Sequence, residues 1–178
     1  MNGKHSRYKT PHSTLHTPHF YVPVDPKLEA NEVRIIPFEE TYRDDMIFMV
    51  LEAKDALGRV PALNEDLLDI RKNYLDKGDM FWLGLSDAGR VIGCIGYSAL
   101  PGTEGVRLHR FYIKASMKRQ GLGTQLYLHA ENHLRAIGKR FILVHLGGAG
   151  YEASRLFYRH FGYEYERDEN YMMKPLEK

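Results

Sequence analysis

Two basic residues and two closely spaced glycines form the segment of this sequence whose chemistry is easiest to interpret. Lys118 and Arg119 come first, and Gly121 and Gly123 follow at the start of an amphipathic helix, after an apolar run that ends at Ile113. Glycine lets the backbone turn tightly and lets a ligand approach the amides. The first turn of a helix has unpaired N–H groups and the positive end of the helix dipole. The segment therefore predicts an anion pocket suited to a pyrophosphate, with the two basic side chains at its rim.

Two common phosphate-binding motifs do not fit this segment. A P-loop needs Lys and then Ser or Thr directly after its second glycine, but Leu122 follows Gly121. A dinucleotide fingerprint needs a third glycine where Leu126 stands, and an acidic end on the next strand, which closes instead on His145 and Leu146. Taken alone, a basic Gly-x-Gly turn is more often a tight connection between a strand and a helix.

The composition excludes several classes of protein. The chain has 178 residues, 43% hydrophobic and 27% charged, which fits one domain with a normal core. A formal net charge of +2 is too small to indicate a nucleic-acid partner. Cys94 is the single cysteine, so no internal disulfide is possible, and its apolar surroundings predict a buried thiol. No apolar run is long enough for a membrane span, and residues 1–6 lack the core of a secretion signal, so we expect a cytoplasmic location.

Residues 1–31 differ in character from the rest of the chain. Prolines break any helix or central strand there, and the histidines among them have no regular spacing that would hold a metal. We therefore expect a flexible or surface-draped arm at 1–31 and a single domain at 32–178. The residues behind this expectation are Pro11, Pro18, Pro23, Pro26, His5, His12, His16 and His19.

The first half of the regular region predicts a strand, two helices and three strands. Apolar residues recur at helical spacing over 46–57 and again over 63–74. Asn64 or Asp66 can cap the second helix, and Gly78 ends it. Turn residues at 87–89 predict a hairpin. The strands are expected at 33–36, 80–86, 90–99 and 106–113.

The second half predicts a helix, a strand, a short helix and a closing pair of strands. One apolar face runs along 122–137 and includes Ile137, after which Gly138 ends the helix. A buried strand is expected at 141–144, a short helix through 156–160, and the closing strands at 161–163 and 171–173. The order predicts an α+β fold, a mixed α/β layer in which helices cover both faces of one sheet.

At this point the sequence resembles a known family. The run Lys118-Arg119-Gln120-Gly121-Leu122-Gly123 is similar to the acetyl-CoA signature of the GNAT superfamily of N-acetyltransferases, Arg/Gln-x-x-Gly-x-Gly/Ala. Residues 110–113 are similar to that family's fourth strand, and 171–174 to its last strand. Residues 152–163 resemble its second signature, in which a Phe/Leu-Tyr pair precedes a Gly-aromatic pair. The resemblance covers 32–176 in element order, and it implies a central mixed, mostly antiparallel sheet with helices on both faces.

The resemblance also implies an activity and a set of binding residues. The activity is direct transfer of an acetyl group from acetyl-CoA to a primary amine of a small molecule or peptide. Tyr158 is implied as the acid that protonates the leaving thiolate, while its alternative role is a core aromatic beside Phe157 and Phe161. The main chain of the strand would pair with the pantetheine arm. The implied cofactor-binding residues are Phe111, Ile113, Lys118, Arg119, Gln120, Gly121, Leu122, Gly123, Thr124 and Tyr158.

Three positions depart from the family pattern. Lys118 stands where Arg or Gln is usual, which keeps the charge but not the planar fork of arginine. Tyr151 stands where the family often has an Asn that touches the pantetheine arm. Arg107 stands where many members carry a carboxylate, so the usual general base is missing.

The general base therefore has several candidates. Histidine titrates near neutral pH, which favours His109. By period-two alternation His109 is expected on the same face of its strand as Phe111 and Ile113. Each candidate also has an ordinary role in a turn or a strand, and a water chain is a further alternative. The candidates are His109, Glu104 and His145.

Two functions other than acetyl transfer fit parts of the sequence. The main alternative is a regulatory module that holds acyl-CoA without turnover; a nucleic-acid-binding domain is a weaker one, because the net charge is small. No metal is expected, since His129 and His133 read as exposed helix positions. The chain is expected to be a monomer or a homodimer. Residues that line the acceptor cleft, or equally belong to the core, are Tyr42, Arg59, Trp82, Tyr97 and Tyr171.

Overall fold

A single seven-stranded sheet runs through the part of the chain that this computed structural model describes, residues 33–147 and 150–176. The strand order is β1-β2-β3-β4-β5-β7-β6, and every neighbouring pair is antiparallel except β4 and β5, which are parallel. The prediction of a mixed, mostly antiparallel sheet is therefore confirmed. The predicted arm at 1–31 lies outside the described residues. The strands are β1 (Arg34–Pro37), β2 (Phe81–Leu85), β3 (Val91–Ala99), β4 (Gly105–Ile113), β5 (Phe141–His145), β6 (Glu164–Glu166) and β7 (Asp168–Pro175).

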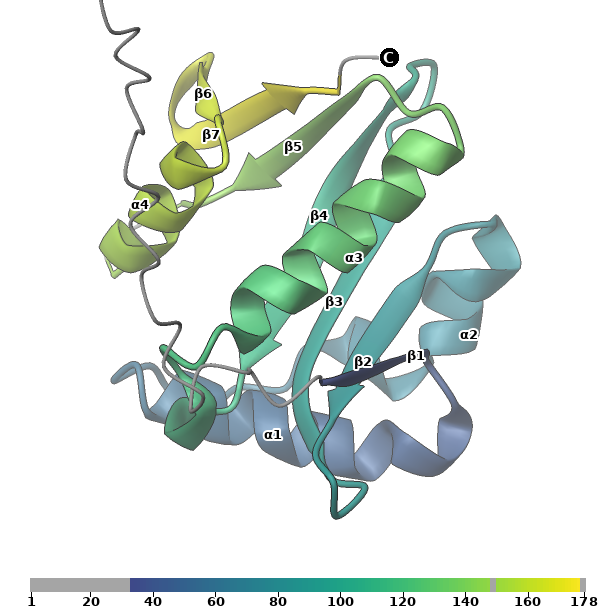
Figure 1. Ribbon diagram of the computed structural model, residues 1–178, viewed down its shortest axis with the longest axis vertical. Coiled ribbons are helices and arrows are strands. Elements are labelled where there is room, and N and C mark those ends of the chain that lie inside the picture. Colours follow the sequence, from purple (N-terminus) through teal and green to yellow (C-terminus); the bar gives the residue numbers. More distant parts are fainter. Residues whose placement is uncertain (1–32, 148–149, 177–178) are drawn as a thin grey trace, which may run out of the picture.

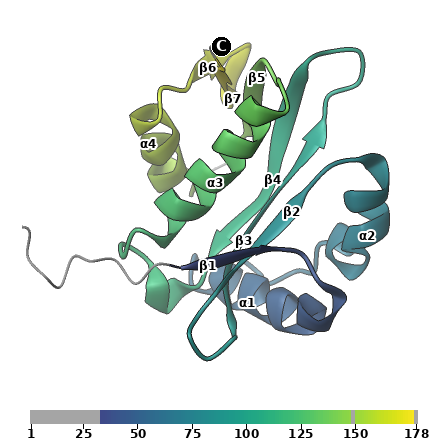
Figure 2. The same ribbon diagram turned by 45° about the vertical axis from the view of Figure 1, so that its right-hand side comes forward.

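Helices cover both faces of the sheet, as Figures 1 and 2 show. On one face α1 and α2 pack over a core that includes Met46, Ile70 and Phe81, and on the other α3 and α4 pack over a core that includes Leu126 and Ile142. Because both faces are covered, β2 is buried along its whole length, and so is most of β3. The helices are α1 (Arg43–Asp55), α2 (Ile70–Asn73), α3 (Leu122–Ala136) and α4 (Glu152–His160), with short 3-10 turns η2 (Glu40–Tyr42), η3 (Glu65–Leu68), η4 (Leu75–Lys77) and η5 (Ala115–Met117).

The second predicted helix is wrong as a continuous element. In its place the chain forms η3, α2 and η4 in succession. Neither predicted cap is used, because Asn64 accepts a hydrogen bond from Lys54 at 2.5 Å and Asp66 pairs with a side chain of β4. Instead the carboxylate of Asp69 accepts from the amide of Lys72 at 2.9 Å, which starts α2 one turn later.

Two further boundaries differ from the predictions. Ile137 is 48% exposed, since α3 ends at Ala136 and the chain turns at Gly138 with φ of 76°. Residues 161–163 form no strand: Gly162 has φ of 84°, and the amide of Tyr163 bonds back to the carbonyl of Tyr158 at 3.0 Å. The closing strand β6 therefore starts only at Glu164.

Strands β4 and β5 separate soon after they begin, which Figure 1 shows as a fan opening toward α4. Their register has three pairs, the last being Arg107 with Leu143. Beyond Arg107, no strand in the described part of the chain pairs with β4 on that side. The opening leaves main-chain N–H and C=O groups along the edge of β4 for another partner.

A β-bulge lies in β4 beside this opening. Gly96 pairs with His109 and Cys94 with Tyr112, so that Ile95 alone faces both intervening residues of β4. The first of these, Arg110, has a left-handed φ of 52°. The thiol of Cys94 donates to the carbonyl of Arg110 at 3.1 Å, which satisfies one main-chain group at the bulge.

A buried carboxylate joins α3 to β7. Glu131 is 6% exposed and accepts hydrogen bonds from Tyr127, from Arg135 at 2.8 Å and from Lys174 at 2.7 and 2.9 Å. Burial raises the pKa of Glu131, but the bonds from Lys174, Tyr127 and Arg135 outweigh it and hold the pKa below its usual value. Because the folded-state pKa is lowered, the stability that this carboxylate contributes is present above the usual value of 4.5 and is lost as the pH falls through the folded-state pKa.

We expect Lys174→Met to destabilise the protein in a pH-dependent manner. At pH ~7 the loss should be about 1.5–3 kcal/mol, the contribution of a hydrogen bond to a charged group. At lower pH the loss should shrink, because a protonated Glu131 needs no cation. Urea unfolding followed by circular dichroism, at pH ~7 and at a pH below the usual value of 4.5 for this carboxyl group, measures the two losses of stability. Lys72→Met, an exposed lysine on α2, is the control, and an equal loss at both pH values would contradict the account.

Candidate active site

The gap between β4 and β5 is the mouth of a pocket of about 640 Å³. Its walls are the separated part of β4, the end of β5, the start of α4 and the end of α1. Every β4 residue from Arg107 to Ile113 contributes to it, and so do Lys118 and Arg119 before α3 and Gly123 in its first turn. The pocket therefore connects the predicted anion-binding segment with the bulge.

Left-handed residues shape the start of α3. Arg119 has φ of 62° and Gly121 has φ of 80°, and this alternation turns successive amides toward one side. The first amide of the helix with a main-chain acceptor is that of Gln125, which bonds to Gly121 at 3.0 Å. Within the described residues, the amides of Leu122, Gly123 and Thr124 have no acceptor. This is the geometry of an anion site at a helix N-terminus.

The predicted cofactor-binding residues divide into two groups. Phe111, Ile113, Lys118, Arg119, Gly123 and Tyr158 line the pocket. The other four do not reach it with their side chains: Leu122 is in the core, Thr124 is exposed, Gly121 forms the turn, and Gln120 donates to the carbonyl of Ser116 at 3.1 Å. For this second group, any contact with a ligand is through the main chain.

Tyr158 on α4 presents its hydroxyl to the pocket from a buried ring. The ring is 5% exposed and lies 5.0 Å from the ring of Tyr163 and 5.5 Å from that of Phe157. Every fully buried side-chain polar atom of the described residues has a hydrogen-bond partner. The hydroxyl of Tyr158 has no such partner, so it is not fully buried and is open to the pocket that the residue lines. Burial raises the pKa of Tyr158 above its usual value, and the phenol therefore stays protonated at neutral pH.

His109 lies on the opposite face of β4 from the one predicted. Its ring is 6.2 Å from that of Tyr74 on the α1 and α2 side, and its Nε2 lies 2.7 Å from the hydroxyl of Ser98. Phe111 packs on Phe157 on the other face, at 5.5 Å. The bulge inserts one residue into β4 and so reverses the period-two alternation on which the predicted face of His109 depended.

The surroundings of His109 make it a weak base. Burial lowers its pKa to about 4, and the positive charges of Arg107 and Arg110 act in the same direction. It is therefore neutral at pH 7 and has a free ring nitrogen, but little affinity for a proton. Its side chain does line the pocket, so its predicted role as the base stays a prediction.

The other two candidate bases have different positions. Glu104 is exposed in the turn before β4, its carbonyl accepts from the amide of Arg140 at 2.9 Å, and it does not line the pocket. Its position therefore gives its predicted role no support. His145 lines the pocket at the end of β5 and stacks on Tyr171 with 4.6 Å between ring centroids.

Of the five residues proposed for the acceptor cleft, Arg59 lines the pocket. Its guanidinium donates to the carbonyl of Gly150 at 3.0 Å and lies 4.0 Å above the ring of Tyr151. It thereby connects the segment after α1 with the segment before α4. Leu57 and Tyr112 also line this side and were missed, since nothing local in the sequence marks them.

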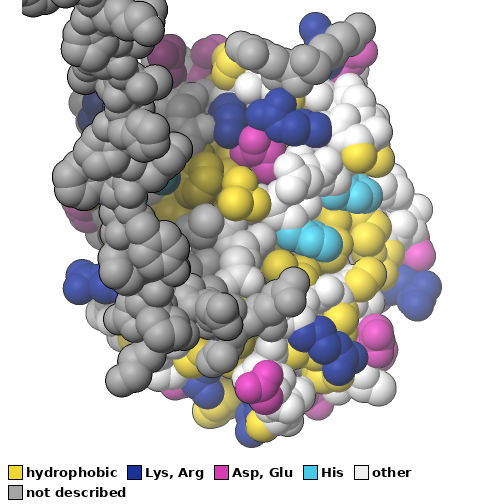
Figure 3. Space-filling view, in the orientation of Figure 1, with side chains coloured by type: hydrophobic (Ala, Val, Ile, Leu, Met, Phe, Trp, Pro, Cys, Tyr) yellow, Lys and Arg dark blue, Asp and Glu magenta, His cyan; other side chains and the backbone are white. Residues whose placement is uncertain are grey.

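The other four residues lie outside the pocket lining. Trp82 and Tyr97 belong to the core under α3, where the rings of His129 and His133 lie 5.4 and 5.0 Å from Trp82. Figure 3 shows histidine side chains beside hydrophobic ones on this face. For these aromatic residues the core alternative holds. Tyr42 packs against the core on the α1 side, and Tyr171 stacks on His145 as described.

The described residues contain neither a metal-binding cluster nor a membrane-spanning helix. Nowhere in 33–147 or 150–176 do three or more His, Cys, Asp or Glu side chains gather as a metal site would require. Of the helices in the same part of the chain, none has the length and apolar character to cross a bilayer.

Comparison with known proteins identifies the class of protein that this fold and pocket define. The sequence model of the acetyltransferase (GNAT) family matches residues 38–163. A GNAT-family acetyltransferase from Staphylococcus aureus Mu50 superposes with a TM-score of 0.74 at 19% identity, covering 82% of this chain and 99% of that chain. No curated protein sequence matches the chain. Because the family match spans most of its length, the chain belongs to the GNAT family of acetyltransferases.

Two further similar structures contain the coenzyme. PaiA N-acetyltransferase from Thermoplasma acidophilum, in complex with coenzyme A, has a TM-score of 0.66 at 18% identity and covers 81% of this chain and 99% of its own. A phosphinothricin acetyltransferase from Sinorhizobium meliloti, in complex with acetyl-CoA, has a TM-score of 0.62 at 18% identity and covers 81% of this chain and 88% of its own. At these identities the likeness establishes the fold.

We expect Lys118→Gln to weaken the binding of coenzyme A about 3- to 10-fold, since it removes an exposed positive charge that lies just before α3 and would donate a charge-assisted hydrogen bond to the diphosphate. Isothermal titration calorimetry with coenzyme A measures the change. The matched control is Lys77→Gln, an exposed lysine of η4 that does not line the pocket. Equal affinity for both variants would show that this end of the pocket does not hold the diphosphate.

Proposed function

We propose that this protein transfers an acetyl group from acetyl-CoA to a primary amine of a small molecule or peptide by direct attack of the amine on the thioester. The observation that carries the proposal is one continuous pocket. It runs from the unpaired amides of α3, past the open edge of β4 and the hydroxyl of Tyr158, to the side where Arg59 and Leu57 lie.

The described residues fit an acyl-CoA ligand. The amides of Leu122, Gly123 and Thr124 have no acceptor and suit the diphosphate, with Lys118 and Arg119 beside them. The unpaired edge of β4 suits the amides of the pantetheine arm, which would add to the sheet like an extended strand. Two of the similar proteins were crystallised with coenzyme A or acetyl-CoA, which is consistent with this fit.

Tyr158 suits the departure of the thiolate. A thiolate leaves more readily when it gains a proton, and a phenol whose pKa is raised by burial is fully protonated at neutral pH. Its hydroxyl is uncommitted, so it can donate to a sulfur in the pocket. Main-chain N–H groups of the open β4 edge, near Phe111, are suited to hold the oxygen of the tetrahedral intermediate.

The attacking amine must be neutral, and the pocket favours that form by its charge. No Asp or Glu is among the described residues that line it, and Arg107 occupies the position where a carboxylate would act as base. Positive charges near an ammonium lower its pKa, so the amine loses its proton to solvent more easily. After the neutral amine has attacked the thioester, its nitrogen carries a positive charge, and His109 is placed to accept the acidic proton that this nitrogen then has to lose.

The regulatory module is the second candidate, because Arg107 replaces the expected base. It differs from the enzyme in one measurement: tight binding of acetyl-CoA with no thiol release on any primary amine would favour the module.

We expect Tyr158→Phe to lower kcat about 100-fold, the lower range for loss of a general acid, while the affinity for acetyl-CoA stays within about twofold. Thiol release measures the rate and calorimetry the affinity. Tyr165→Phe removes a hydroxyl from a half-exposed tyrosine of β6 and serves as the control. Unchanged kcat in Tyr158→Phe would remove Tyr158 from the mechanism.

For His109, we expect a pH profile without a step at its usual pKa. Because its pKa is lowered to about 4, the ring is neutral from about pH 5.5 upward, and kcat/KM should show no inflection near 6.5 from this residue. His109→Gln should lower kcat/KM by roughly 10-fold at every pH in that range, since a weak base contributes less than one matched to neutral pH. An unchanged rate would eliminate His109 as the base. An inflection near 6.5 that disappears in the variant would contradict the lowered pKa.

A further inference from the structure

The charged side chains on the acceptor side of the pocket are all positive. Lys118 and Arg119 lie at the α3 end, where the diphosphate would bind. The remaining charged or titratable nitrogen-bearing side chains lie on the other side of the gap, and within the described residues no carboxylate accompanies them in the lining. They are Arg59, Arg107, Arg110, His109 and His145.

Two of these guanidinium groups form no ion pair with a carboxylate of the described residues. Arg110 is neutralised by Asp66, with which it forms hydrogen bonds at 2.7 and 2.9 Å. Arg107 makes no hydrogen bond or ion pair with any described residue, and the partners of Arg59 are a carbonyl and a ring face, neither of which carries a charge. The acceptor side therefore has two guanidinium groups that no ion pair neutralises. The exposed carboxylate of Glu152, whose pKa is lowered first by main-chain hydrogen bonds, lies near enough to Arg59 for the positive charge to lower that pKa further.

The positive charges of these arginines lower the pKa of two neighbouring groups. Burial is the largest cause that lowers the pKa of His109 and of Lys54. The charges of Arg107 and Arg110 lower the pKa of His109 further, and the charges of Arg110 and Arg59 do the same for Lys54. Asp66 opposes both effects without cancelling them.

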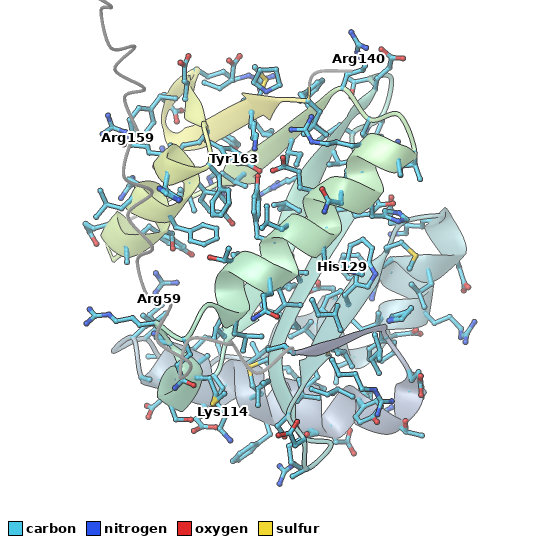
Figure 4. All side chains as sticks on the ribbon, in the orientation of Figure 1. Arg59, Lys114, His129, Arg140, Arg159 and Tyr163 are labelled. Atoms are coloured by element: carbon cyan, nitrogen blue, oxygen red, sulfur yellow. The ribbon has the colours of Figure 1, made fainter. Side chains whose placement is uncertain are left out.

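The two unpaired arginines are placed to meet one ligand. Arg107 is the last residue of β4 that pairs with β5, so it lies where the gap opens. Arg59 enters from the segment after α1 and, as Figure 4 shows, lies at the left side of the molecule, between α4 above and α1 below. By reaching Gly150 and Tyr151 it also limits the width of the opening.

We propose that the acceptor is a small primary amine that also carries an oxyanion group, and that Arg107 and Arg59 bind this group. The proposal rests on the function proposed above. A carboxylate or phosphate accepts paired hydrogen bonds from a guanidinium, and here it would supply the missing negative charge. The acceptor is small because a pocket of about 640 Å³ also has to hold the end of the pantetheine arm. Polycationic amines are disfavoured by the same charges.

The test compares amines in matched pairs that differ only in the anion. α-Amino acids are assayed against their amides, and O-phosphoethanolamine against ethanolamine, with spermidine as the cationic arm; thiol release gives kcat/KM. We expect the anionic member of the preferred pair to react about 10- to 100-fold faster, the loss that accompanies removal of a hydrogen bond to a charged group. Whether the carboxylate or the phosphate pair shows the larger ratio identifies the group.

Two arginine variants test whether Arg107 causes the preference for anionic amines. Arg107→Gln should abolish most of the preference while the affinity for coenzyme A stays unchanged. Arg140→Gln is the matched control, because Arg140 is exposed at the top of Figure 4, far from Arg59, and does not line the pocket, so the preference should stay intact. A wild-type protein that acetylates the neutral or cationic members equally well would overturn the inference and leave the acetyltransferase function standing.

A failure of the acetyltransferase function itself is recognised separately. If no amine in the panel releases thiol, the N-acetylated members are titrated by calorimetry into the protein saturated with coenzyme A. Tighter binding of the anionic member, weakened about 10-fold or more by Arg107→Gln, supports the anion site without turnover. Equal binding of both members, or no effect of Arg107→Gln, overturns it.

Discussion

The separation of β4 from β5 is the constraint on which the pocket depends. A parallel pair that stops after the register of Arg107 with Leu143 leaves the rest of β4 with unpaired main-chain groups at the centre of a seven-stranded sheet. Unpaired groups in such a place are costly unless something else bonds to them. The fold accepts this cost at one position, and an extended ligand with amide groups of its own can make up the missing hydrogen bonds.

The bulge in β4 determines which of its side chains face each layer of helices. Because one residue is inserted, His109 and Arg110 both face α1 and α2, while Phe111 faces α3 and α4. The left-handed conformation of Arg110 is a strained one for a residue with a side chain, and the paired hydrogen bonds that its guanidinium donates to Asp66 help to hold it. In the proposed reaction, the coenzyme and the acceptor would approach from these two faces and meet at the bulge.

Features that depend on neighbours in the sequence were predictable. The turn at Gly121, the apolar face of α3 and the hairpin between β2 and β3 follow from local periodicity and turn chemistry, and the class of fold follows from the order of the elements. The resemblance assigned Tyr158 and Phe111 to one cofactor-binding site, and both residues line the same pocket.

Features that depend on contacts across the sheet were not predictable. The bulge follows from one residue of β3 facing two of β4, which no pattern within β4 reveals, and it reversed the expected face of His109. The second helix is broken because Asp66 is occupied by Arg110, a residue 44 positions away, and is not available as a cap. The positive charge of the acceptor side likewise depends on Arg59 and Arg107, which only the fold brings to the same gap.

The burial of Cys94 has a practical consequence for enzymology. Its thiol is fully enclosed beneath the bulge, and burial raises its pKa to about 12, so almost none of it is thiolate at the pH of a typical assay. It is also the single cysteine of the chain. Aromatic disulfide reagents should therefore react with the coenzyme released during turnover and leave the folded protein unlabelled, so that colour development counts catalytic events without a background from the enzyme.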